Sequence, residues 1–397
     1  MLYIRTARLI ISEPMRYAIG LDVTLGNHKK VAWTTFLLII LAFSAVPISF
    51  SMQSSRSISA TGMINHMTAY TKKVIWDDGS TEIIEITRQG SIVLNGHEII
   101  ACGFHITGLG GGQQLVWNDT IGNMVLNRLE SDGVRFIALS IVNEQTYSEQ
   151  NIRGFVNYWM PKFYSHKMYV VVQVAHKGID RPPNIYPDYQ FPFISWVIDL
   201  FNKKPWSDII IAWNIGWEWD SLDNNPNLTA EQMNASLSRL YPLIKEKLRD
   251  TLIGEIPLFS KNVLWKDYGT GTIQMLKYSD VPGWDLYLLQ NDDGSIEQPR
   301  MDNRMKSYQE QALLAAGKSG YKVWWGEAGL YKNQSKMADR SIFDYLLFAG
   351  GYNNCAAMFI WEIWSVGQPT WHLNAFNSDG TPKAWYFTVV SYFPKLD

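Results

Sequence analysis

Residues 209–220 read IIIAWNIGWEWD, an apolar run of strand length that reaches Gly216 and then presents the carboxylate of Glu218. A continuous apolar run, rather than an alternating one, is typical of a strand covered on both faces, as in a parallel sheet. A similar stretch, KVWWGEAG at residues 322–329, again places a glutamate, Glu327, after a strand and a glycine. The repeated pattern predicts two carboxylates at the ends of two buried strands.

Short apolar runs alternate with segments of helical spacing along most of the chain. The runs that predict strands are residues 99–104, 134–139, 169–174, 209–213, 257–259, 284–288, 322–325 and 356–360. The segments that predict helices are residues 120–132, 149–166, 191–203, 229–249, 271–279, 302–318, 336–349 and 382–392. Thr229 and Gln232 have the form of a capping box at one helix start. The alternation favours an α/β fold, a (β/α)8 TIM barrel, over its main competitor, a doubly wound sheet.

Two β-hairpins are predicted before the barrel, and they form an N-terminal extension to it. The first pairs residues 73–76 with 82–86, and the second pairs residues 91–94 with 97–100. Asn95 and Gly96 between the second pair of strands favour a type I′ turn.

The N-terminal part of the chain indicates export. Residues 1–30 form a basic leader, and residues 31–52 run without a charge and predict a signal peptide or membrane anchor. A linker at residues 53–71 then leads to the catalytic domain, residues 72–397. The basic flank precedes the hydrophobic segment, so the positive-inside rule predicts an extracellular protein, secreted or anchored to the membrane.

Composition excludes several classes of protein. The net charge is −2 with no visible cluster of Lys and Arg, so nucleic-acid binding is not expected. Two cysteines rule out a disulfide-rich scaffold, and the histidines form no metal-binding motif, so no cofactor is expected. The 17 Trp, 20 Tyr and 17 Phe serve a core, and they also suit stacking against sugar rings.

The two glutamates match the chemistry of glycoside cleavage. Active sites of (β/α)8 barrels form at the carboxyl ends of the strands, where Glu218 and Glu327 are expected. Glycoside hydrolysis needs one carboxyl group as an acid and a second that stays ionised. Either residue alone would more often be a solvated or ion-paired glutamate, but the matched context of the two favours a shared site.

Three motifs resemble the retaining (β/α)8 glycoside hydrolases of clan A, closest to the cellulases and mannanases of family 5. WNIGWE at residues 213–218 is similar to the fourth-strand motif, and WWGEAG at residues 324–329 resembles the seventh-strand motif. FIWEIW at residues 359–364 looks like the eighth strand.

This resemblance implies Glu218 as acid/base and Glu327 as nucleophile. Its implied substrate-binding or supporting residues are Arg135, His176, His105, Trp217, Trp361 and Trp325. Arg135 is implied to support the nucleophile, although pairing with a core acid is an equal alternative. Trp217 replaces the usual asparagine before the acid, and an indole donates one hydrogen bond but accepts none. Tyr287 and Gln290 are further candidates whose strand register the sequence leaves open.

We therefore expect a retaining glycoside hydrolase that cleaves a β-linked polysaccharide, β-glucan or β-mannan, in the endo-acting cellulase or mannanase manner. The expected partner is a polysaccharide or oligosaccharide, with membrane anchoring through residues 31–52. Two alternatives remain open: a carbohydrate-binding protein without turnover, and a transglycosylase on the same barrel.

Overall fold

The computed structural model describes residues 68–107, 119–142, 149–175, 190–203, 205–217, 228–248, 252–256, 271–288, 310–330, 333–348, 355–363 and 374–396. The chain separates into two units, Met1–Ile64 and Asn65–Asp397, and every described residue belongs to the second. The predicted leader and the hydrophobic segment at residues 31–52 therefore lie outside the described residues. In the ranges given above, no helix has the length and apolar character needed to cross a membrane.

Eight parallel strands pair in chain order and close into a barrel, because the last strand pairs with the first. They are β5 (Ala101–Thr107), β6 (Phe136–Val142), β7 (Tyr169–Ala175), β8 (Ile210–Trp217), β9 (Leu252–Ile256), β10 (Val281–Leu288), β11 (Val323–Leu330) and β12 (Cys355–Ile360). This topology confirms the predicted parallel barrel. It also explains why the strands read as continuous apolar runs, since helices cover their outer faces.

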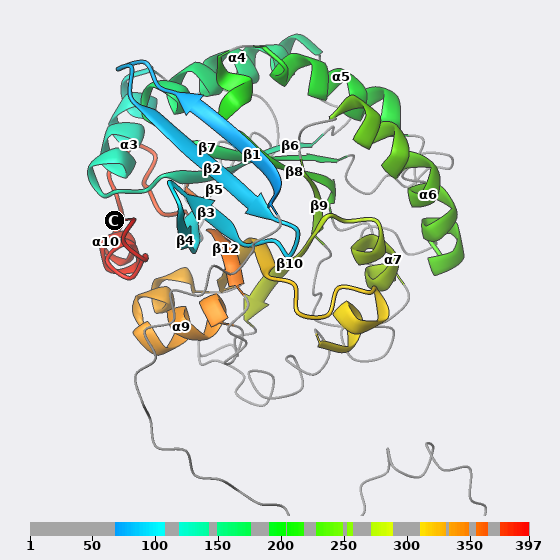
Figure 1. Ribbon diagram of the computed structural model, residues 1–397. Coiled ribbons are helices and arrows are strands. Elements are labelled where there is room, and N and C mark those ends of the chain that lie inside the picture. The colour runs from blue at the N-terminus through cyan, green and yellow to red at the C-terminus, as the bar shows by residue number, and fades with distance from the viewer. Residues whose placement is uncertain are drawn as a thin grey trace, which may run out of the picture. The chain divides into compact units, whose positions relative to one another are not determined.

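Helices follow the barrel strands and lie around their outer side (Figure 1). They are α3 (Asp119–Ser131), α4 (Glu149–Ser165), α5 (Phe191–Phe201), α6 (Ala230–Lys247), α7 (Gly271–Lys277), α9 (Arg340–Phe348) and α10 (Ala384–Val390), with the short 3-10 helices η2 (Trp206–Ile209) and η4 (Gln334–Ala338). A helical segment at residues 310–315 precedes β11. The predicted capping box is confirmed at the start of α6, where Thr229 and Gln232 exchange hydrogen bonds.

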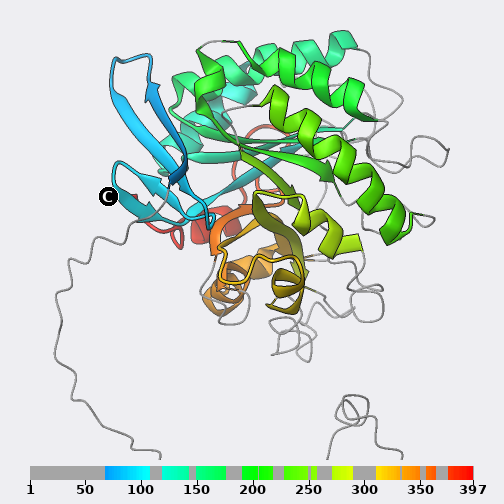
Figure 2. The same ribbon diagram turned by 45° about the vertical axis from the view of Figure 1, so that its right-hand side comes forward.

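A four-stranded antiparallel sheet lies across one end of the barrel (Figures 1 and 2). Its strands are β1 (Thr68–Ile75), β2 (Thr81–Thr87), β3 (Ile92–Leu94) and β4 (His97–Ile99), as the two predicted hairpins require. Asn95 and Gly96 have positive φ angles of 50° and 87°, which a type I′ turn needs at both central positions. Lys72 donates to the carbonyl of Ile210 at the start of β8, so the sheet covers the amino ends of the strands.

Two boundaries differ from the sequence expectation. Strand β1 begins at Thr68, inside the segment expected to be linker. Strand β9, Leu252–Ile256, precedes the predicted residues 257–259, which lie outside the described residues. Gly254 and Glu255 interrupt the apolar pattern of β9, yet both pair through their backbone with β10. Backbone pairing, rather than side-chain pattern, therefore defines this strand.

Side chains fill the barrel interior in layers. Near the amino end Phe136 of β6 and Tyr169 of β7 stack with 5.5 Å between ring centroids. Tyr169 also contacts Trp76, beside β1, at 5.3 Å, so the sheet and the barrel share one core. Strand β5 lies close to β6 at Gly103, where an added Cβ would lie 2.0 Å from the carbonyl oxygen of Phe136. Only glycine fits at this position.

Candidate active site

Glu327 is a buried carboxyl group on β11, with 2% of the residue exposed. Its Oε2 accepts a hydrogen bond of 2.9 Å from the hydroxyl of Tyr287 on β10. The pairing of β10 with β11 sets Asp285 opposite Glu327 and Tyr287 opposite Gly329. This pairing supplies the register that the sequence left open. The neighbouring strand therefore orients the carboxylate through Tyr287.

His105 of β5 lies beside this carboxyl group and is fully buried. Its Nε2 is 3.9 Å from Oε1 of Glu327, 2.7 Å from Oε1 of Gln173 and 2.9 Å from Oγ of Ser140. Burial lowers the pKa of His105 to about 4, although the hydrogen bond with Gln173 acts in the opposite direction. The imidazole is therefore neutral at pH 7, and its contact with Glu327 is not an ion pair.

Trp361 follows β12 and covers the His105 ring, with 4.6 Å between the ring centroids. Its backbone N–H donates to the carbonyl of Ala328, and its carbonyl accepts from Nε2 of Gln334. Oε1 of the same Gln334 amide accepts from the N–H of Leu330 at 2.7 Å. Gln334 thus ties the carboxyl ends of β11 and β12 together and fixes Trp361 beside the site.

The structure does not bring Arg135 to this site. Arg135 immediately precedes β6, at the amino end of the barrel, and its Nη2 lies 2.7 Å from Oε2 of Glu82. Its Nε donates to the carbonyl of Lys167. At about 3.3 Å per residue, it lies roughly 16 Å along the strand from Ser140, which contacts His105. The expectation that Arg135 supports Glu327 is wrong, and its alternative, pairing with an acid, is correct.

Trp325 also differs from the expectation of a substrate-binding residue. It is fully buried and packs against Trp284 at 6.0 Å between ring centroids. Burial raises the pKa of the Cys355 thiol, and the indole N–H of Trp325 opposes this effect from close by. Trp325 therefore belongs to the core.

The other predicted residues fall partly or wholly outside the described residues. Glu218 and His176 follow the last described residues of β8 and β7, and the side chain of Trp217 is likewise outside. Their roles stay predictions. The backbone of Trp217 ends β8, so the residue after it is attached at the carboxyl end of the barrel.

Several buried polar residues near Glu327 were not singled out from the sequence. Each is a single polar residue within, or directly after, an otherwise apolar strand, which is the signal that could have found it. They are Ser140, Gln173, Asn214, Asp285 and Glu362. Among the described residues, no group of three or more His, Cys, Asp or Glu side chains is arranged to hold a metal ion.

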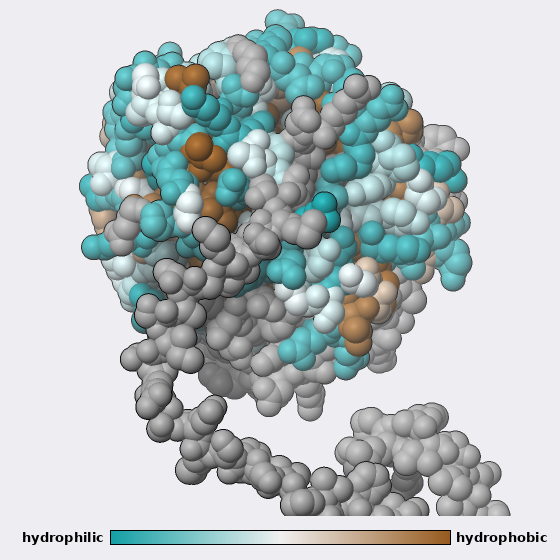
Figure 3. All heavy atoms as spheres, viewed as in Figure 1, coloured by the Kyte–Doolittle hydropathy of each residue, from teal (hydrophilic) through white to brown (hydrophobic). Residues whose placement is uncertain are grey.

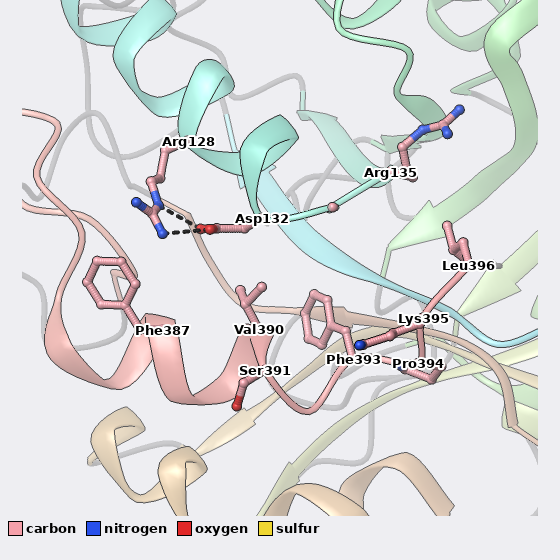
Figure 4. Close-up of a pocket in the computed structure, with 11 residues that line it drawn as sticks. Arg128, Asp132, Arg135, Phe387, Val390, Ser391, Phe393, Pro394, Lys395 and Leu396 are labelled. Carbon is pink, nitrogen blue, oxygen red and sulfur yellow. Dashed lines mark hydrogen bonds and ion pairs between the residues drawn. The ribbon is translucent and has the colours of Figure 1, made fainter.

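A pocket of about 600 Å³ lies at the opposite end of the barrel, between α3, α10 and the C-terminal segment (Figure 4). Figure 4 shows Arg128 paired with Asp132 in this pocket, while the side chain of Arg135 turns away from them. The face of the molecule shown in Figure 3 is mainly hydrophilic where it is coloured, with hydrophobic residues in small separate groups. The pocket lies at the amino end of the barrel. Active sites of (β/α)8 barrels form at the carboxyl end, where Glu327 lies, so we do not assign this pocket to the active site.

Comparison with known proteins gives a fold but no close relative. No family model matches the chain, and no curated protein sequence matches it. A β-glucuronidase from Ruminococcus gnavus, solved with uronic deoxynojirimycin, superposes with a TM-score of 0.53 at 12% identity, covering 80% of this chain and 57% of that chain. A Faecalibacterium prausnitzii β-glucuronidase superposes with a TM-score of 0.50 at 12% identity, covering 81% and 56%.

The likeness establishes the fold. The chain spans just over half the length of these two glycosidases. At 13% identity, Bacteroides uniformis β-glucuronidase 2 is similar over 78% of this chain and 39% of its own, with a TM-score of 0.50. All three are glycoside hydrolases by description, and none is described as a member of family 5.

Proposed function

We propose that this chain is a retaining glycoside hydrolase that acts on β-linked glycosides, with Glu327 as its nucleophile. The observation that carries the proposal is the buried Glu327 carboxyl group on a strand of a (β/α)8 barrel, oriented by the Tyr287 hydroxyl. The fold that the chain shares with solved β-glucuronidases supports the same reaction class.

The proposed reaction has two steps at the anomeric carbon. In the first, an oxygen of Glu327 forms a bond to that carbon while the bond to the leaving oxygen breaks, and Glu218 gives its proton to the leaving oxygen. In the second, Glu218 takes a proton from water, the water oxygen bonds to the anomeric carbon, and the bond to Glu327 breaks. Two inversions retain the configuration. This mechanism requires the two carboxyl groups to lie about 5–5.5 Å apart.

The described neighbours of Glu327 suit a nucleophile. The hydrogen bond from Tyr287 occupies Oε2 and limits rotation of the carboxyl group, so Oε1 keeps a fixed direction. His105 is neutral, so its contact adds no charge that would hold the carboxylate as an ion pair. A carboxylate that is held in position can attack carbon once substrate is bound.

We propose a β-linked polysaccharide such as β-glucan or β-mannan as the substrate, on the basis of the sequence resemblance and the abundance of tryptophan. The uncharged segment at residues 31–52 supports a catalytic domain outside the cell, secreted or anchored.

A covalent trap tests the nucleophile directly. Full-length protein is incubated with activated 2-deoxy-2-fluoro-β-glycosides of glucose, mannose and glucuronic acid, and its peptides are weighed by mass spectrometry. We expect one fluoroglycosyl group on the peptide that contains Glu327, and none in Glu327→Gln. Glu82→Gln, at the other end of the barrel, is the matched control and should still be labelled.

The stereochemistry gives a second measurement. NMR of an aryl β-glycoside during turnover should show the β-anomer of the product first, with the α-anomer appearing only by mutarotation. Label on a residue other than Glu327, or the α-anomer as the first product, would contradict the mechanism. Absence of both label and turnover for all three sugars would leave the carbohydrate-binding alternative in its place.

A further inference from the structure

Three polar side chains of neighbouring strands face the barrel interior at one level. Ser140 of β6 is paired with Gln173 of β7, and Gln173 is paired with Asn214 of β8. Paired residues of parallel strands point to the same face of a sheet. The residue before Asn214, Trp213, packs outward against Phe201 of α5, so Asn214 points inward. We call Ser140, Gln173 and Asn214 the polar arc.

The polar arc stands on an apolar part of the interior. Two residues earlier on the same strands are Ala138, Val171 and Ala212, which are also buried. Residues two apart on a strand share a face, so these small side chains lie directly toward the amino end from the arc. The arc is therefore where the interior of β6, β7 and β8 changes from apolar to polar, on the side of the carboxyl ends.

Hydrogen bonds join the arc to His105, and they occupy the side-chain oxygen of Gln173. Its Oε1 accepts from Oγ of Ser140 at 2.8 Å and lies 2.7 Å from Nε2 of His105. Since a carbonyl oxygen only accepts, Nε2 of His105 carries the proton and Nδ1 presents a lone pair. The arc is thereby coupled to the residue that lies 3.9 Å from Glu327.

Four buried polar atoms of this group have no protein partner in the described part of the chain. They are Nδ1 of His105, Nε2 of Gln173, and both Nδ2 and Oδ1 of Asn214. Asn214 is only 1% exposed, so bulk water does not reach it. Buried polar groups in native proteins are nearly always hydrogen-bonded, to protein, ordered water or ligand. These four atoms include two donors, the amide nitrogens, and two acceptors, the Asn214 oxygen and Nδ1 of His105.

We propose that the polar arc and His105 form a binding site for uncharged hydroxyl groups. A hydroxyl suits the site because it donates and accepts at once, which matches the amide atoms of Asn214 and the lone pair of His105. It can come from ordered water or from the sugar bound for cleavage. The second source rests on the function proposed above, and the first does not.

The site does not suit a carboxylate. Ser140, Gln173 and Asn214 are uncharged, and the neighbouring charge-bearing group is the acid Glu327, whose Oε1 is 3.9 Å from His105. Placing a second carboxylate in this buried region would bring two acids together, and the described residues of the arc supply no cation to compensate, which is costly. The part of the sugar that faces the arc is therefore a neutral hydroxyl-bearing edge and not the acid group of a uronic acid.

Asn214→Leu tests the arc, because leucine keeps the branching at Cγ and removes all four hydrogen-bonding positions of the amide. The matched control is Gln274→Leu on the outer helix α7, which also removes a partly buried amide. Full-length wild type and variants are assayed with p-nitrophenyl β-glycosides of glucose, mannose and glucuronic acid, and with monodeoxy analogues of the preferred one. A crystal structure of the ligand-free protein shows whether ordered water occupies the arc.

If a sugar hydroxyl binds there, wild type loses roughly tenfold to a hundredfold in kcat/KM on one deoxy analogue, and Asn214→Leu loses the same factor on the parent sugar but none further on that analogue. If water alone binds, ordered water lies within hydrogen-bonding distance of Asn214, and the variant affects parent and analogues equally. Either result supports the site.

An arc that is empty of water in the crystal, together with unchanged kinetics in Asn214→Leu, would overturn the proposal. So would a preference for the glucuronide that Asn214→Leu abolishes, because it would place a carboxylate at the arc. Failure of the proposed hydrolase function looks different: wild type cleaves none of the glycosides, while ordered water at Asn214 still establishes the hydroxyl site.

Discussion

Each end of the barrel holds a glutamate that accepts a hydrogen bond from a tyrosine, but the two glutamates have different surroundings. At the amino end, Oε2 of Glu82 accepts from Tyr169 at 2.8 Å, from the indole of Trp76 at 2.9 Å and from the guanidinium of Arg135 at 2.7 Å. At the carboxyl end, Oε2 of Glu327 accepts from Tyr287 at 2.9 Å, and the neutral His105 lies 3.9 Å from Oε1 of Glu327.

The electrostatics of the two ends follow from these partners. Burial raises the pKa of Glu82, but the hydrogen bond and charge of Arg135, with help from Tyr169 and Trp76, outweigh it and leave the pKa below its ordinary value. Arg135 balances the charge of the Glu82 carboxylate, and this ion pair joins the N-terminal sheet to the barrel. The same residue type serves stability at Glu82, where Arg135 matches its charge, and is proposed for chemistry at Glu327, which the Tyr287 hydroxyl holds in place.

Exchanging each glutamate for glutamine is the strongest test of this contrast. Glu327→Gln should lower kcat by at least about 10⁴-fold, since a neutral amide cannot act as the nucleophile. Glu82→Gln should leave kcat unchanged and lower the free energy of unfolding by about 2 kcal/mol, because Arg135 keeps its charge without a partner. Initial rates and urea unfolding of both variants measure the two effects. A large loss of activity in Glu82→Gln would show that the ends are not separate.

Acid should weaken the two ends in different pH ranges. The pKa of His105 in the folded protein is about 4, so the unfolded chain takes up its proton first as the pH falls below about 6.5. Native stability should therefore decrease by roughly 3 kcal/mol between pH 6.5 and 4. Glu82 affects stability at lower pH. The stabilisation by this carboxylate is present above its ordinary pKa and is lost as the pH falls through its lowered pKa in the folded protein.

Urea unfolding between pH 7 and 3 measures both ranges. His105→Asn should flatten the dependence between pH 6.5 and 4, and Glu82→Gln should flatten only the part at lower pH. An unchanged profile in His105→Asn would mean that the pKa of this histidine is the same in the folded and the unfolded chain, and the lowered pKa described above would be wrong.

The two tyrosines give the smallest and most closely matched effect. Tyr169→Phe removes one of three donors to Glu82 and should lower the free energy of unfolding by about 1 kcal/mol without changing kcat. Tyr287→Phe removes the described donor to Glu327 and should lower kcat about tenfold, with little change in stability. If Tyr169→Phe and Tyr287→Phe lowered kcat equally, the proposed division between a stabilising amino end and a catalytic carboxyl end would be wrong.

Sequence reasoning found the barrel because apolar runs and helical spacing are local signals. Seven of the predicted strands overlap the observed ones, and the fifth was misplaced because Gly254 and Glu255 hide a strand that backbone pairing defines. It also placed Glu327 on the seventh barrel strand, since the apolar run around it is visible in the sequence itself, and its role as nucleophile stays a prediction.

The supporting residues were harder to predict, because direction and level along a strand decide their neighbours. Arg135 comes at the beginning of its apolar run. A residue at the beginning of a barrel strand lies at the amino end of the barrel, so the sequence already indicated that Arg135 is far from the carboxyl-end site. Ser140, Gln173 and Asn214 are ordinary residues when taken singly. Only the register of β6, β7 and β8 brings them together, and that register is a property of the closed barrel.

The absence of a side chain at Gly103 allows β5 and β6 to lie close together. With the Phe136 carbonyl 2.0 Å from where a methyl group would stand, even alanine would push β5 away from β6. His105 is two residues further along β5, and Ser140 is four residues further along β6. Widening the gap between these two strands would shift His105 relative to Ser140, so a substitution at Gly103 is expected to change the candidate site from a distance.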